Sequence, residues 1–201
     1  MKIGEIFLSV QGEGRYIGRP QVFIRLAGCN LRCGWCDTKR SWKGGKEMTI
    51  KEVMAKAAKF NLKSVCITGG EPMLQKEELR ALIALLKRRG YEIVLETNGT
   101  LYDKRIFDMV DCVSCDMKPP SSGERSDERL LPKLKRKDQV KIIIKDGKDF
   151  EYAMKIVKKA RIEVILQPAG GRRLKPLIGK VLRKRADCRV LPQLHRIGGI
   201  R

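Results

Sequence analysis

Short apolar runs alternate with amphipathic segments along the chain. Eight runs rich in Val and Ile have the length of strands, and several are apolar without interruption, which is typical of strands that are covered on both faces. These runs are EIFLSV (5–10), VFIRLAG (22–28), VCIT (65–68), EIVLET (92–97), CVSCDM (112–117), VKIIIK (140–145), EVILQP (163–168) and CRVLPQ (188–193). We therefore predict eight strands, most of them in the interior of a sheet.

Between these runs, apolar residues recur three or four positions apart, as on the buried face of a helix. The first stripe follows Thr49 and Glu52, which have the spacing of a capping box, and the second ends before Gly90, a typical helix terminator. The four stripes are Ile50, Val53, Met54 and Ala57; Leu79, Leu82, Ile83 and Leu86; Phe150, Ala153, Met154 and Val157; and Leu174, Leu177, Ile178 and Val181. Strands that alternate with helices predict parallel βαβ units and an α/β fold.

The length of the chain, 201 residues of which 42% are hydrophobic, supports one sizeable core. We find no internal repeat or linker and expect a single domain over residues 1–201. Segment 119–133 is the best candidate for a long mobile loop. In parallel α/β barrels, chemistry gathers where strands end. Polar and glycine-rich segments follow the predicted strands at 68–72, 96–99, 114–120 and 167–171.

The chain is strongly basic, with 44 Lys and Arg against 23 Asp and Glu and a formal net charge of +21. Such an excess attracts nucleic acid, anionic metabolites or an acidic partner. The basic residues are spread along the sequence, although they are denser at 133–137 and 172–185, and only five Phe, four Tyr and two Trp are available to stack on bases. We therefore interpret the charge as a solvated surface and expect no obligatory nucleic-acid partner.

The hydropathy of the chain and its cysteines indicate the cellular compartment of the protein. No apolar run reaches the roughly 18–20 residues that span a bilayer, and the N-terminal stretch turns polar too early for a signal peptide. Seven cysteines, three of them within eight residues, indicate a reducing compartment and a metal instead of disulfides. We expect a cytoplasmic protein with no membrane association.

Cys29, Cys33 and Cys36 lie in GCNLRCGWCDT, where three thiolates suit zinc, copper(I) or iron–sulfur. Structural zinc takes four protein ligands. Cys112 and Cys115 have C-x2-C spacing, which leaves a zinc site or a second cluster open, but residues three apart in a strand point to opposite faces, as buried small residues would. A 4Fe–4S cluster held by three cysteines leaves one iron open to a substrate or cofactor.

The spacing C-x3-C-x-aromatic-C, with Trp35 before Cys36, resembles the signature of the radical S-adenosylmethionine superfamily, and TGGEP (68–72) resembles its second motif. The resemblance implies that S-adenosylmethionine occupies the fourth corner of the cluster, with glycines that let the backbone approach its amino group. In that superfamily, an electron from the cluster cleaves the cofactor to a 5′-deoxyadenosyl radical, which abstracts a substrate hydrogen.

The whole chain resembles the 7-carboxy-7-deazaguanine synthase family, from IFLSVQGEGRYIGRPQVFIRLAGCNLRCGWCDT (6–38) through ETNG, SCDMK and LQP to LPQLHRIGG. The resemblance implies a partial parallel αβ barrel and a lyase that converts 6-carboxy-5,6,7,8-tetrahydropterin to 7-carboxy-7-deazaguanine with loss of ammonia. That product serves the queuosine or archaeosine branch of tRNA modification. The resemblance also implies one 4Fe–4S cluster, S-adenosylmethionine, Mg²⁺, a homodimer and an electron donor such as flavodoxin or ferredoxin.

The same resemblance assigns roles to residues. Arg25 would grip the substrate carboxylate, Glu13 would accept hydrogen bonds from the aminopyrimidinone edge, and His195 would be a hydrogen-bond partner or proton carrier. Other substrate contacts are expected from Val10, Gln11, Gly12, Thr68 and Arg201. Cofactor contacts are expected from Trp35, Cys36, Asp37, Gly70, Glu96, Ser114, Asp116, Lys118 and Gln167. Thr38 offers the hard oxygen that Mg²⁺ prefers.

Two other functions stay open on the sequence. A radical activase, which takes a hydrogen from a glycine of a partner protein, would share C-x3-C-x2-C and GGEP, whereas SVQGEG and PQLH favour a pterin site. A basic, metal-stabilised RNA-binding module would contain zinc without iron.

The short chain also predicts that the barrel lacks some of the helices of a complete αβ barrel.

Overall fold

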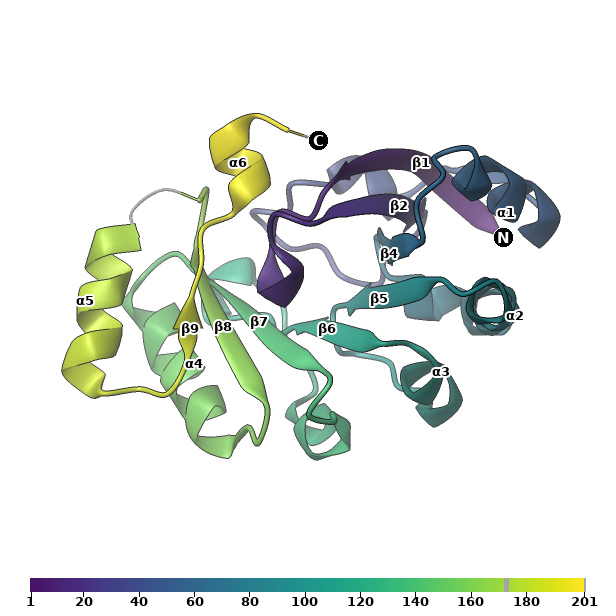
Figure 1. Cartoon of the computed structure of the whole chain (residues 1–201). Helices are drawn as coiled ribbons and strands as arrows, with labels where there is room; N and C mark the ends of the chain where they lie inside the picture. Colours follow the sequence, from purple (N-terminus) through teal and green to yellow (C-terminus); the bar gives the residue numbers. More distant parts are fainter. Residues whose placement is uncertain (172–173, 201) are drawn as a thin grey trace.

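The computed structural model describes residues 1–171 and 174–200. In this part of the chain, nine strands form one sheet in the order β3-β1-β2-β4-β5-β6-β7-β8-β9, which curves without closing (Figure 1). Neighbours are parallel from β2 to β9, whereas β1 is antiparallel to β2 and β3. The strands are β1 (Lys2–Val10), β2 (Pro20–Leu26), β3 (Lys46–Glu47), β4 (Ser64–Gly69), β5 (Glu92–Thr97), β6 (Cys112–Asp116), β7 (Gln139–Ile144), β8 (Glu163–Pro168) and β9 (Arg189–Val190).

The longer helices cover the outer face of the curved sheet, while the C-terminal helix lies on the side where the sheet is open (Figure 1). The helices are α1 (Ile50–Ala58), α2 (Lys76–Arg88), α3 (Lys104–Met109), α4 (Gly147–Lys159), α5 (Leu174–Lys184) and α6 (Leu194–Gly198). The predicted capping box of Thr49 and Glu52 is confirmed, and Gly90 follows α2 with a left-handed φ of 73°. None of the described helices has the length and apolarity needed to cross a membrane.

The eight predicted strands and four predicted helices are present, but the structure corrects three expectations. β1 is antiparallel to β2 because the connection at residues 11–19 is too short for the crossover that a parallel pair needs. The predicted strand at 188–193 shrinks to two residues, ahead of Pro192, which cannot donate to a ladder. Segment 119–133 is no structureless loop, because it contains the 3-10 helices η4 (Pro120–Ser122) and η5 (Glu128–Lys133).

The side chains of the parallel strands alternate between two environments. In β4, Val65 and Ile67 belong to the core under the helices, whereas Thr68 faces the inside of the curve. In β7, Val140 and Ile142 face the helices, while Lys141 faces inward. Full burial of each such apolar side chain stabilises the fold by about 1.5–3 kcal/mol. The helix side of the sheet therefore supplies most of the stability, and the inner side is left for polar groups.

Arg15 closes the amino-terminal end of the curved sheet. This residue lies in η1 (Gly14–Tyr16), where its backbone N–H donates to Gln139 Oε1 at 2.8 Å and its Nε lies 3.0 Å from Glu163 Oε2. Gln139 and Glu163 are the first residues of β7 and β8, so these contacts join the segment after β1 to the other half of the sheet. The inside of the curve is consequently accessible from the carboxyl ends of the strands.

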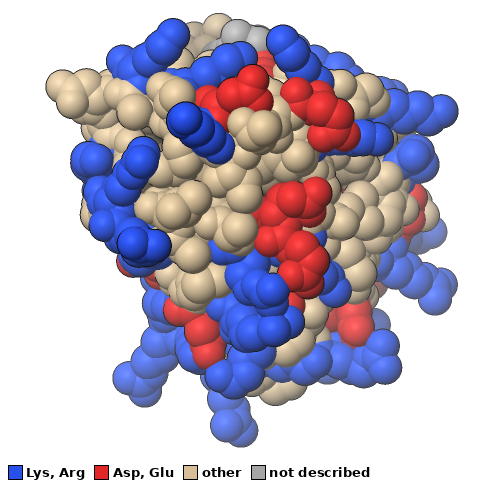
Figure 2. Space-filling view, turned by 90° about the vertical axis from the view of Figure 1, so that its right-hand side faces the viewer, with Lys and Arg blue, Asp and Glu red and all other residues tan. Residues whose placement is uncertain are grey.

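On the face of the molecule that carries α1 and α2, lysine and arginine side chains are spread out instead of forming one patch (Figure 2). Figure 2 shows them projecting on all sides of the face that carries α1 and α2, with acidic side chains between them. This distribution agrees with the interpretation of the charge as a solvated basic surface.

Candidate active site

A cavity of about 620 Å³ lies inside the curved sheet at the carboxyl ends of the strands. Its volume falls in the range of roughly 300–1,000 Å³ that is usual for small-molecule sites. The predicted site residues that line it are Val10, Gln11, Gly12, Glu13, Arg25, Cys29, Cys33, Trp35, Cys36, Asp37, Thr38, Thr68, Gly70, Glu96, Asp116, Lys118 and His195. Ser114 and Gln167 are fully buried outside the lining, and Arg201 lies outside the described residues.

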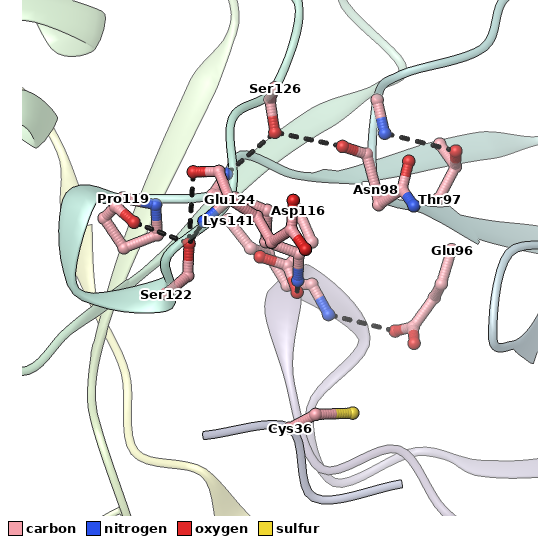
Figure 3. Close-up of polar contacts among 12 residues, drawn as sticks. Cys36, Glu96, Thr97, Asn98, Asp116, Pro119, Ser122, Glu124, Ser126 and Lys141 are labelled. Atoms are coloured by element: carbon pink, nitrogen blue, oxygen red, sulfur yellow. Dashed lines mark hydrogen bonds and ion pairs between the residues drawn. The ribbon is translucent and has the colours of Figure 1, made fainter. Parts of the chain in front are cut away.

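The loop after β2 brings the three clustered cysteines to the cavity. It is held against η4, because Gly34 N–H donates to the Ser122 carbonyl at 2.9 Å and Trp35 Nε1 donates to Ser121 Oγ at 3.1 Å. Cys36 faces the same space as Lys141 and Glu96 (Figure 3). The segment predicted to be a mobile loop therefore acts as the support of the cysteine loop.

The cysteine loop fits a cluster better than a single metal ion. Within residues 1–171 and 174–200, no three His, Cys, Asp or Glu side chains converge on a position suited to one ion. A 4Fe–4S cluster is larger, and each cysteine ligates a different iron. Burial raises the pKa of the Cys29 thiol and raises that of Cys33 to about 11. Both thiols therefore carry protons until the iron ions of a cluster displace those protons.

Three further cysteines are packed as small apolar residues, which confirms the prediction made for Cys112 and Cys115. Cys112 and Cys115 are both fully buried on β6, and Cys115 belongs to the helix-side core whereas Cys112 lies outside that core. Cys66 on β4 packs with Phe7 and Phe23 on the inner side. These positions keep the three thiols apart from the cysteine loop.

Gly69, the last residue of β4, and Gly70, which follows it, let two chain segments pass in close contact. A Cβ atom at Gly69 would overlap the backbone of Leu26, and one at Gly70 would overlap the backbone of Gly28. The structure thus adds a packing reason to the expectation that these glycines serve cofactor approach. Glu71, next in the motif, is fully buried and accepts hydrogen bonds from Thr97 Oγ1 at 2.9 Å and from the Asn98 N–H at 2.7 Å, which ties the end of β4 to the end of β5.

Asp116, which lines the cavity, has an unused acceptor. Its Oδ2 lies 2.8 Å from Lys118 Nζ, but its Oδ1 is buried without a hydrogen-bond partner. Among the described residues, only one other buried side-chain atom, Gln167 Oε1, also has no partner. A ligand with N–H or O–H donors would satisfy Asp116. Burial lowers the pKa of Lys118, but the charge and hydrogen bond of Asp116 outweigh it, so the pKa of Lys118 is raised and its ammonium persists.

Arg25 forms the cationic wall of the cavity. Its Nε donates to Glu5 Oε1 at 2.8 Å, and Arg40 Nη2 binds the same oxygen at 2.8 Å. The guanidinium of Arg25 lies 5.6 Å from the centre of the Phe7 ring, which is stacked on Phe23. Arg25 is therefore a part-buried residue of the cavity, with an apolar surface beside its charge.

An ion-paired group of three residues lines the same cavity as the cysteine loop. Lys141 Nζ is 2.5 Å from Glu13 Oε2 and 3.2 Å from Glu96 Oε1, although these residues come from β7, the segment after β1 and β5. Thr68 Oγ1 donates to Glu96 Oε2 at 3.2 Å, and Gln11 Nε2 donates to Glu96 Oε1 at 3.4 Å. Sequence reasoning missed Lys141, for which the only signal was a lysine inside a buried apolar run.

The C-terminal segment closes one side of the cavity. Gln193 Nε2 donates to Glu13 Oε1 at 2.7 Å, the Leu194 N–H donates to the Gly12 carbonyl at 2.9 Å, and His195 Nε2 lies 3.5 Å from Asp37 Oδ2. The hydrogen bond from His195 is the main reason that the pKa of Asp37 lies well below its usual range. Three residues in a row thus bind to the two loops that carry the predicted site.

The family comparison agrees with this geometry. Residues 23–167 match the Radical SAM superfamily. The chain is 42% identical over 203 residues to the 7-carboxy-7-deazaguanine synthase of Methanospirillum hungatei, covering 100% of this chain and 86% of that protein. It is 37% identical over 207 residues to the synthase of the same name from Thermoplasma acidophilum, covering 98% of this chain and 96% of that protein.

Solved structures give the same result at the level of the fold. The crystal structure of QueE from Escherichia coli superposes with a TM-score of 0.76 at 25% identity, covering 94% of this chain and 92% of that one. SuiB from Streptococcus suis, in a crystal structure with bound S-adenosylmethionine, has a TM-score of 0.60 at 15% identity and shares the fold alone.

Proposed function

The chain belongs to the 7-carboxy-7-deazaguanine synthase family of radical S-adenosylmethionine enzymes, and from this premise we propose how its own side chains serve the reaction. The enzyme uses a 4Fe–4S cluster and S-adenosylmethionine in deazapurine biosynthesis. The activase and RNA-module alternatives are set aside by this membership. The observation that carries the proposed roles is the convergence of the cysteine loop, Asp116 and Arg25 on one cavity of about 620 Å³.

Cys29, Cys33 and Cys36 would hold the cluster, and S-adenosylmethionine would lie between the cysteine loop and the ends of β4, β5 and β6. When bound, the cluster and S-adenosylmethionine supply the radical that removes a hydrogen atom from the substrate. Support for this placement comes from the unpartnered Asp116 Oδ1, which suits an amino or hydroxyl donor. Ser114 and Gln167, which do not line the cavity, would act by supporting their neighbours.

The substrate, 6-carboxy-5,6,7,8-tetrahydropterin, would place its carboxylate at Arg25 and its aminopyrimidinone edge at Glu13. A guanidinium binds a carboxylate through strong charge-assisted hydrogen bonds, and a carboxylate accepts from adjacent N–H groups. Gln11 would act indirectly, because its amide already donates to Gln21 and its oxygen accepts from the Glu13 N–H at 3.2 Å. His195, oriented by Asp37, would exchange hydrogen bonds or a proton with the substrate.

We also propose a magnesium ligand, a domain organisation, a location and several partners. Thr38 would bind Mg²⁺, supported by its hydroxyl lying 3.2 Å from the Asp37 carboxylate at the cavity. One sheet through the described chain supports a single domain, and seven unpaired thiols support a cytoplasmic location. The family likeness supports a homodimer and an electron donor such as flavodoxin or ferredoxin. It also supports turnover that requires no nucleic acid.

The test is an anaerobic assay of the reconstituted enzyme with the carboxytetrahydropterin, S-adenosylmethionine, Mg²⁺ and a reductant. We expect 7-carboxy-7-deazaguanine, with ammonia released. A Cys33→Ala variant is the matched control and should form neither product nor 5′-deoxyadenosine. Formation of 5′-deoxyadenosine without the deazaguanine would contradict the assigned substrate, and a Thr38→Val enzyme with undiminished Mg²⁺ dependence would exclude Thr38 as the magnesium ligand.

A further inference from the structure

Lys141 is a charged residue at a buried position, where removal of the charge from water is energetically unfavourable. Only 2% of its side chain is exposed, and its neighbours on β7, Val140 and Ile142, belong to the apolar core. A buried ion pair is often no more stabilising than apolar residues of similar volume. The stability of the sheet therefore gives no reason for a lysine at this position, whereas its location on the cavity wall does.

The contacts of Lys141 fix one substrate-facing side chain from both sides. Glu13 Oε2 binds Lys141 Nζ at 2.5 Å, while Glu13 Oε1 accepts from Gln193 Nε2 at 2.7 Å. These two donors come from β7 and from the segment before α6, and each holds a different oxygen. The carboxylate of Glu13 is thereby fixed at the cavity surface. Lys141 forms a second ion pair, with Glu96 on β5, in which Lys141 Nζ lies 3.2 Å from Glu96 Oε1.

We propose that Lys141 is a positioning residue that holds the Glu13 carboxylate against the N–H edge of the bound substrate. The proposal rests on the proposed function, because it takes the aminopyrimidinone edge as the group that Glu13 recognises. A carboxylate offers only acceptors, which match two N–H donors, whereas a carboxylic acid would turn one O–H donor toward them. Lys141 thus helps to select a substrate edge that donates hydrogen bonds.

The surrounding charges predict how this arrangement responds to pH. Burial raises the pKa of Glu13, but the charge and hydrogen bond of Lys141, with the hydrogen bond of Gln193, bring it below its ordinary value. Burial lowers the pKa of Lys141, but Glu13, Glu96 and Asp116 raise it well above the ordinary range. The charged and titratable groups that face this pair are Glu96, Asp116, Lys118, Cys66 and His195.

Removal of Lys141 should therefore leave the effect of burial on the Glu13 pKa opposed mainly by the hydrogen bond from Gln193. In the wild-type enzyme Glu13 stays ionised as the pH falls to its depressed pKa, so substrate binding persists on the acid side. In Lys141→Met, Glu13 should take up a proton at a higher pH, and substrate binding should be lost from there downward. Binding should recover at high pH, where Glu13 ionises again.

The experiment measures the substrate dissociation constant between pH 5.5 and 8.5, with the reconstituted enzyme and S-adenosylmethionine under anaerobic conditions. We expect Lys141→Met to weaken binding at least tenfold at pH 6 and by less at pH 8.5, and Lys141→Arg to stay closer to wild type. Lys145→Met is the matched control, because Lys145 is exposed directly after β7 and should leave the profile unchanged.

A loss that is equal at every pH would overturn the proposal, since that is what a purely structural role produces. Unchanged binding in Lys141→Met would overturn it as well. If Lys141→Met does not fold, Lys141→Gln takes its place with the same expected profile. Glu13→Gln should weaken binding by a similar factor at every pH between 5.5 and 8.5, because Gln has no carboxylate to protonate, and binding equal to wild type would contradict the role of the Glu13 carboxylate. Failure of the wild-type enzyme to bind the pterin would instead contradict the proposed function.

Discussion

His195 in the C-terminal helix lies 3.5 Å from Asp37, the residue directly after the third clustered cysteine. Arg196 reaches the same carboxylate oxygen at 3.5 Å. Helix α6 has only five residues, which is too short to be stable alone. Its order therefore depends on contacts with other parts of the chain, and those with Asp37 join it to the loop that would hold the cluster.

Replacing Asp37 by Asn should loosen α6 while keeping the shape of the side chain. A partly exposed ion pair contributes up to about 1 kcal/mol, so amide protection over residues 194–198 should fall by up to about fivefold. Hydrogen exchange followed by mass spectrometry measures this change. Glu77→Gln, on the exposed face of α2, is the control and should leave those amides unchanged. Unaltered protection in Asp37→Asn would show that other contacts hold the helix.

Anaerobic reconstitution should give about four irons per chain, because each cubane carries four irons and one cysteine triad faces the cavity. Replacing the remaining cysteines should leave the iron count unchanged. For this purpose Cys66, Cys112, Cys115 and Cys188 are changed together to Ala. Iron and sulfide analysis checks both statements, and a count near eight would contradict the single-cluster assignment.

Arg25 and Arg40 bind the same oxygen of Glu5, which makes them a matched pair. The Arg25 side chain is 13% exposed and that of Arg40 is 63% exposed, so a substrate carboxylate at Arg25 would be the better desolvated. Loss of such a partner costs about 2–5 kcal/mol, and Arg25→Ala should weaken substrate binding by tens- to thousands-fold. Arg40→Ala should have a smaller effect. Calorimetric affinities that change by the same factor in both variants would remove Arg25 from the proposed carboxylate site.

Glu13 should make the stability of the protein depend on pH on the acid side. Its pKa in the folded protein is lowered from an ordinary value of 4.5, so its contribution is present above about pH 4.5 and is lost as the pH falls through the folded pKa. In Glu13→Gln, the free energy of unfolding should fall less steeply between pH 4.5 and the acid limit of folding. Urea titrations at several pH values measure this slope, and exposed Glu77→Gln should retain the wild-type slope. Equal slopes in all three proteins would contradict the lowered pKa.

The positive charge is expected to be dispensable for turnover of the free pterin. Replacing Arg172, Arg173, Lys180 and Lys184 together by Gln should leave the rate of product formation unchanged, although Arg172 and Arg173 lie outside the described residues. Adsorption of RNA should be weak and should decrease steeply with salt, because it rests on phosphate contacts. A requirement for RNA in the assay, or modification of the RNA itself, would contradict this expectation.

Local patterns predicted much of the fold. The apolar runs in β4, β5, β7 and β8 match the observed strands to within a residue or so, because buried parallel strands must be apolar where they face the helices. Elements with little periodicity were missed. Helix α3 has six residues and buries only Ile106 and Phe107, which is too short a pattern to detect.

The sequence by itself determined the cysteine triad, the polar strand ends and the family likeness, because each of these depends on residues that are close together or on motifs in fixed order. Only the tertiary structure decided which strand ends meet around one cavity. It also revealed that segment 119–133 supports the cysteine loop and that α6 rests on Asp37.

Lys141 shows the difference most clearly. In the sequence it is one of 44 basic residues, and nothing near it identifies a partner. In the fold it lies 2.5 Å from Glu13, and both side chains are largely withdrawn from water. An ion pair gains its strength and its effect on pKa from proximity and burial, and both are set by the packing of strands that are distant in sequence.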